Sequence, residues 1–141
     1  MNAVRTFTLG LLSGPRWVLL CVVVALMGSN LFVPAFFPDL LEAKAVIVTF
    51  ACGGALMMFL TDRYGYTRIL GLGHIFWLAL VPFLLTRWSL HPADTPIGIW
   101  LRAVTVINII SLILDAVDVF RYLRGERGAT SGSAAEGETV E

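Results

Sequence analysis

Five polar side chains recur at helical spacing in the last apolar segment of the chain: Asn108, Ser111, Asp115, Asp118 and Tyr122. Residues three and four positions apart share one face of a helix, so these side chains form a stripe. A carboxylate such as Asp115 is expensive to hold in hydrocarbon, so this face must meet another helix, a partner or water. The stripe is therefore the first candidate for an interior site.

A histidine in the preceding apolar segment, His74, lies at a depth that suits this stripe. At ~1.5 Å of rise per residue, His74 and Asp115 both fall roughly 8 Å inside the same boundary of their segments. An imidazole beside a carboxylate can exchange a proton near neutral pH. We therefore predict a buried polar site of His74, Asn108, Ser111 and Asp115. It is either a proton-sensitive site or a hydrogen-bond network that fixes helix register, and the structural interpretation is preferred.

Other polar residues near the segment ends are expected to play simpler roles. Asp118 and Arg121 are three residues apart on one helix and predict an exposed charge pair at the interface. Glu42 and Lys44 begin the second segment and are expected to extend their charged ends toward water. Asn30 is expected to pack and hydrogen-bond inside the first segment.

No cofactor, metal or catalytic signature is found in the sequence. His74 and His91 fall at opposite ends of the predicted bundle, so bis-histidine haem ligation within one chain is not expected. No zinc or di-metal spacing occurs. Cys21 and Cys52 both lie in apolar segments and are expected to act as packing residues, without a disulfide. We therefore expect no cofactor and no enzyme activity.

The composition is that of a membrane protein. Hydrophobic residues make up 57% of the 141 residues and charged residues only 14%, whereas soluble domains are about a quarter charged. The net charge of zero gives no indication of a nucleic-acid partner. Pro82 is expected to kink the outer half of the third segment. The apolar runs predict a four-span domain over residues 16–124, with spans at about 17–37, 40–61, 68–88 and 97–120.

The two ends and the short connections predict the topology. Residues 1–15 are weakly amphipathic and suit a short helix at the membrane surface, while residues 125–141 have the composition of a disordered tail. Seven of the ten Lys and Arg residues fall on the side that holds both termini, which predicts cytoplasmic termini. The expected fold is an all-α, up-down four-helix transmembrane bundle. Short loops and the preference for arginine suit a bacterial inner membrane.

Three classes of function are compatible with these features. The preferred one is a non-catalytic accessory, assembly or regulatory component, because the loops are minimal and the interior offers little chemistry. The alternative is a small proton-coupled transporter that acts as a homodimer, with Asp115 and His74 in the cytoplasmic half of the bundle. A membrane enzyme acting on a lipid or quinone is the second alternative. The expected partners are membrane lipids and either a membrane protein or further copies of the chain, but no nucleic acid.

Overall fold

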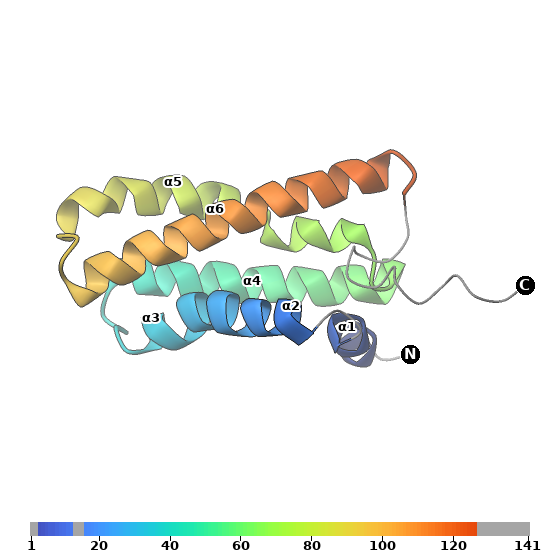
Figure 1. Ribbon diagram of the computed structural model, residues 1–141, viewed down its shortest axis with the longest axis horizontal. Helices are drawn as coiled ribbons and strands as arrows, with labels where there is room; N and C mark the ends of the chain where they lie inside the picture. Colours follow the sequence, from blue (N-terminus) through green and yellow to red (C-terminus); the bar gives the residue numbers. More distant parts are fainter. Residues whose placement is uncertain (1–2, 13–15, 127–141) are drawn as a thin grey trace, which may run out of the picture.

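The computed structural model describes residues 3–12 and 16–126, and within these ranges the chain is helical and has no strand (Figure 1). The predicted all-helical fold is confirmed. Most of the segment predicted to be a disordered tail, residues 127–141, lies outside the described residues. In chain order the elements are α1 (Ala3–Leu12), α2 (Arg16–Cys21), η1 (Val22–Phe32), α3 (Val33–Ala35), α4 (Leu41–Tyr64), η2 (Arg68–His74), α5 (Trp77–Arg87), η3 (Trp88–Leu90) and α6 (Pro96–Leu123).

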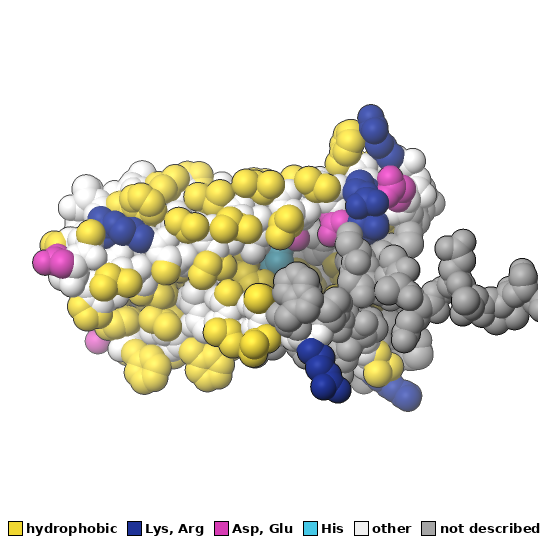
Figure 2. Space-filling view, viewed as in Figure 1, with side chains coloured by type: hydrophobic (Ala, Val, Ile, Leu, Met, Phe, Trp, Pro, Cys, Tyr) yellow, Lys and Arg dark blue, Asp and Glu magenta, His cyan; other side chains and the backbone are white. Residues whose placement is uncertain are grey.

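Two helices are long and apolar enough to cross a membrane. They are α4, with 24 residues and a mean hydropathy of 1.9, and α6, with 28 residues and a mean hydropathy of 2.1. The third segment meets the same criteria only as a pair of helices, Arg68–His74 and Trp77–Leu90, bent by 40°. In the first segment the apolar helix Val24–Ala35 is shorter than a membrane crossing. Apolar side chains cover the visible face along the length of these helices (Figure 2).

The long elements lie side by side around a narrow core (Figure 1). The core contains Trp77 and Leu84 of α5, Leu101 and Val104 of α6, and Val46 of α4, all fully buried. Helix η2 packs between α4 and α6. Helix α1 occupies the segment predicted to lie at the membrane surface and contacts α4, which it meets at the end of the bundle that also holds the end of α6 (Figure 1).

The middle of the first segment, η1, is a π-helix, and a proline marks where its hydrogen bonding changes. The N–H of Val33 donates to the carbonyl of Gly28, five residues earlier. The same register would require Pro34 to donate to Ser29, but proline has no N–H. The indole Nε1 of Trp100 donates to the Ser29 carbonyl instead, at 2.8 Å. This bond ties the start of α6 to η1 and satisfies a buried backbone acceptor.

The third segment has a bend before Pro82, the residue at which a kink was predicted. Pro82 lies inside α5, whereas the bend falls between η2 and the start of α5. Two glycines explain the position of η2. A Cβ added at Gly71 would lie 3.0 Å from the backbone oxygen of Asp115, and one at Gly53 would lie 2.6 Å from the carbonyl oxygen of Gly73. Tertiary contact between backbones therefore fixes this turn, which proline chemistry alone did not predict.

Candidate functional site

Polar side chains of the described interior meet in pairs at successive levels of the bundle. Each pair joins elements that are far apart in the sequence, so each one fixes how two helices align. This arrangement differs from the single stripe that the sequence predicted. The pairs are Glu42 with Arg87, Asn30 with Asn108, His74 with Asp115, and Arg68 with Asp118.

The structure brings His74 and Asp115 together. The Nδ1 atom of His74 lies 2.6 Å from Oδ2 of Asp115, and the two side chains are 15% and 21% exposed. One face of the imidazole stacks on Trp77, with ring centroids 4.1 Å apart and planes inclined by 24°. Because Trp77 is fully buried, the histidine ring is held in one orientation toward the carboxylate.

A groove between α6 and the η2–α5 segment lies beside Asp115. Its volume is about 360 Å³, and Asp115 is the charged side chain that lines it. The second carboxylate oxygen of Asp115, Oδ1, accepts no hydrogen bond from any part of the chain that the structure describes. The remaining lining is apolar: Gly71, Leu72, Ile75 and Leu78 on one side, and Leu112, Ala116, Val119, Phe120 and Leu123 on the other.

Asp118 pairs across the bundle and not along its own helix. The Nη1 atom of Arg68 donates to Oδ1 of Asp118 at 2.7 Å, and the Arg68 side chain is only 9% exposed. Arg121, which is 43% exposed, instead donates through Nε to Glu126 at 2.7 Å. The predicted pair of Asp118 with Arg121 is therefore wrong. A buried guanidinium such as that of Arg68 needs a carboxylate partner far more than the exposed guanidinium of Arg121 does. Asp118 therefore pairs with Arg68.

Asn108 was predicted to share a site with His74 and Asp115, but it pairs with Asn30 instead. Its Nδ2 donates to Oδ1 of Asn30 at 3.0 Å, and Nδ2 of Asn30 donates back to Oδ1 of Asn108 at 3.0 Å. Both side chains are fully buried. Ser111 makes no side-chain hydrogen bond to the described residues. The four predicted site residues thus separate into the His74–Asp115 contact, half of an asparagine pair, and a serine outside both.

The asparagine pair makes a testable prediction about stability. Replacing only Asn108 with Leu leaves the Asn30 amide buried without a partner, so we expect a loss of about 1–3 kcal/mol in unfolding free energy. Replacing both residues with Leu removes both polar groups and should recover part of that loss. A double-mutant cycle, measured by denaturant unfolding in detergent micelles, should give a coupling of roughly 0.6–2 kcal/mol. Strictly additive losses would show that the two amides do not act together.

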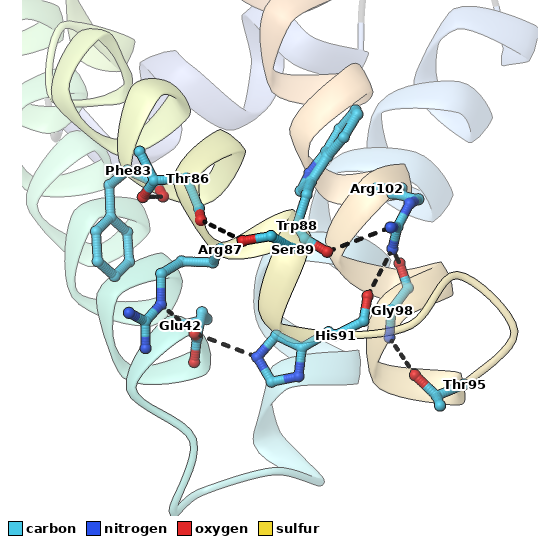
Figure 3. A network of polar contacts seen from close by, with 10 residues as sticks. All are labelled: Glu42, Phe83, Thr86, Arg87, Trp88, Ser89, His91, Thr95, Gly98 and Arg102. Atoms are coloured by element: carbon cyan, nitrogen blue, oxygen red, sulfur yellow. Dashed lines mark hydrogen bonds and ion pairs between the residues drawn. The ribbon is translucent and has the colours of Figure 1, made fainter.

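Glu42 was expected to extend toward water, and this prediction is wrong. The residue is only 1% exposed. Arg87 donates through Nε to its Oε1 at 2.6 Å, and Nε2 of His91 lies 3.3 Å from the same oxygen. Figure 3 shows Arg87 and His91 reaching this carboxylate from the end of α5 and from the loop that follows. Lys44, by contrast, is exposed. Glu42 thus forms an ion pair that joins the start of α4 to the end of α5, and only Lys44 of the two residues extends into solvent.

A second arginine continues this network along the same loop. Arg102 donates through Nη1 to the carbonyls of His91 and Gly98, at 3.1 and 3.0 Å, and through Nη2 to the carbonyl of Trp88 at 3.3 Å (Figure 3). These bonds satisfy carbonyls at the end of the third segment and at the start of α6. The connection between α5 and α6 is therefore held at one side by the Glu42–Arg87 ion pair and at the other by hydrogen bonds from the Arg102 side chain to backbone carbonyls.

The chemistry available to these sites is limited. Within the described ranges, no group of three His, Cys, Asp or Glu side chains is placed to hold a metal ion. The His74–Asp115 contact can share a proton, and the open oxygen of Asp115 can accept one hydrogen bond from a bound group. Comparisons of the chain with family models, with curated proteins and with solved structures found no match.

Proposed function

We propose that this protein is a four-span component of a bacterial inner membrane, with both termini in the cytoplasm, and that it serves there as a non-catalytic accessory, assembly or regulatory subunit. The two membrane-length helices and the bent third segment support the membrane assignment. The excess of Arg and Lys at the end that holds both termini supports the orientation.

The pairing of interior polar groups carries the functional part of this proposal. His74 contacts Asp115, and Arg68 contacts Asp118. The Glu42 carboxylate is contacted by Arg87 and His91 at the other end. Each contact joins two segments, which is the arrangement that a rigid bundle needs. In a catalytic site such groups would face a space for the substrate. In a proton pathway they would follow one another along the bundle, close enough to pass a proton. The pairs thus favour a structural role.

One observation favours the alternative function, proton-coupled transport by a homodimer. The His74–Asp115 pair borders an open groove, so a change in its protonation could be coupled to a ligand there. In that case Asp115→Asn would abolish proton-coupled flux.

The experiment that separates the two functions is a measurement of what the intact protein binds. The tagged full-length chain is crosslinked in its own membrane, transferred to lipid nanodiscs and analysed by native mass spectrometry. We expect a stoichiometric complex with a larger, different membrane protein. Recovery of the chain alone or only as a homodimer would overturn the subunit proposal. Asp115→Asn is compared with Asp62→Asn, which changes an exposed carboxylate at the end of α4.

A further inference from the structure

The groove beside Asp115 has the shape that a helix would fill. Its α6 wall is formed by residues spaced four, three and four apart, the spacing by which one helix packs against another. The facing wall follows η2 and the start of α5. Side chains on both walls are well exposed within this chain, among them Leu78 at 63% and Leu123 at 76%. The α6 residues in this spacing are Leu112, Ala116, Val119 and Leu123.

The charge in the groove restricts what can occupy it. Asp115 lies about two turns before the end of α6, roughly 12 Å along the helix, which places it below the level of lipid headgroups. Its Oδ2 is taken by His74, and its Oδ1 has no donor among the described residues. A lipid acyl chain would cover this oxygen without a hydrogen bond, which is costly. A second copy bound through the same groove would bring two carboxylates together.

We propose that the groove binds a transmembrane helix of a different protein, and that this helix is apolar except for one lysine, arginine or other hydrogen-bond donor that meets Oδ1 of Asp115. The inference rests on the subunit role proposed above and names the chemistry of the partner. The apolar side chains of the partner helix pack against the two walls of the groove, and its single donor hydrogen-bonds to the Asp115 carboxylate. Hydrogen bonds between helices in a bilayer act in this way to select partner and register.

The test is site-specific photo-crosslinking of the full-length protein in its own membrane. The photoreactive residue p-benzoylphenylalanine is placed at Leu112 or Val119, in the groove, and at Leu114 or Val117, which are exposed and lie outside the groove lining. Crosslinked peptides are identified by mass spectrometry. We expect the groove positions to capture one transmembrane segment that carries a donor, and the control positions not to capture it.

Two variants test the chemistry and the shape separately. Asp115→Asn should lower capture about three- to tenfold, the range that one interhelical hydrogen bond supports, and replacing the partner's donor by leucine should do the same without a further loss in the double variant. Ala116→Trp keeps the carboxylate but fills the groove, so it should abolish capture altogether. Ala116 is exposed, and Leu114→Trp is its matched control on the other face, so neither change needs to disturb the fold.

Each of the other outcomes overturns the inference. The proposed occupant would be excluded by lipid adducts, by crosslinks to a second copy, or by a captured segment without a donor. It would also be excluded if neither variant lowered capture. A complex that forms through another face would leave the subunit role standing while this inference fails. If native mass spectrometry finds no partner protein, both the subunit role and this inference are overturned.

Discussion

Arg87→Met is expected to lower the free energy of unfolding by about 3–5 kcal/mol, the cost of leaving a buried charge without its partner. The substitution keeps most of the side-chain volume but removes the guanidinium that donates to Glu42 at 2.6 Å. The Glu42 carboxylate is 1% exposed and would retain only His91, at 3.3 Å. Denaturant titration of the purified protein in detergent micelles, followed by tryptophan fluorescence and circular dichroism, measures the loss.

Two further variants show whether the lost ion pair is the cause. Lys44→Met removes a positive charge from an exposed position near Glu42 on the same helix and should change stability by no more than about 0.5 kcal/mol. The double variant Glu42→Leu with Arg87→Met replaces both charges by apolar groups and should recover most of the stability. A double variant as unstable as Arg87→Met would show that packing of the arginine stem, and not the buried charge, is responsible.

The extents of the long helices could be predicted from the sequence because hydropathy and the residues that start or end a helix act locally. The predicted spans 40–61 and 97–120 correspond to Leu41–Tyr64 and Pro96–Leu123. The start of the last helix has a local cause, since Thr95 accepts a hydrogen bond from the N–H of Gly98 and Pro96 occupies the first turn. These signals reside in neighbouring residues, so one sequence is enough to find them.

The winding of the other segments could not be predicted, because contacts across the bundle determine it. The π-helical turn of η1 is matched by an indole from α6, and the 3-10 helix η2 is positioned by glycines that touch α4 and α6. Helical periodicity in one segment carries no information about either contact.

The candidate site could be predicted where depth alone selects the partner. Counting residues from the helix ends placed His74 beside Asp115, and the same count would have paired Glu42, in the first turn of α4, with Arg87, in the last turn of α5. It would not have found the Asn30–Asn108 pair. Asn30 lies within two turns of the end of its segment, whereas Asn108 lies more than three turns into α6, so only the stagger of the two helices brings them together.

Gly53→Ala is expected to destabilise the protein, whereas Gly54→Ala, one residue later in the same helix, is expected to leave it unchanged or stabilise it. A Cβ at Gly53 would lie 2.6 Å from the carbonyl oxygen of Gly73, and a backbone atom has little freedom to move away. Overpacking of this kind costs about 1–3 kcal/mol. A Cβ at Gly54 meets nothing within 4 Å, so the gain in helix propensity, up to about 1 kcal/mol, stands alone.

The difference between these two variants tests the close approach of α4 and η2, on which the His74–Asp115 contact depends. Gly73 directly precedes His74, so a methyl group that pushes η2 away from α4 also shifts the imidazole that stacks on Trp77. Gly53→Ala should therefore change the tryptophan fluorescence of the folded protein and lower its unfolding free energy. Gly54→Ala should leave the fluorescence unchanged and should not lower the unfolding free energy. Equal effects from both substitutions would mean that the two backbones do not touch at Gly53, and the register that joins His74 to Asp115 would lose its support.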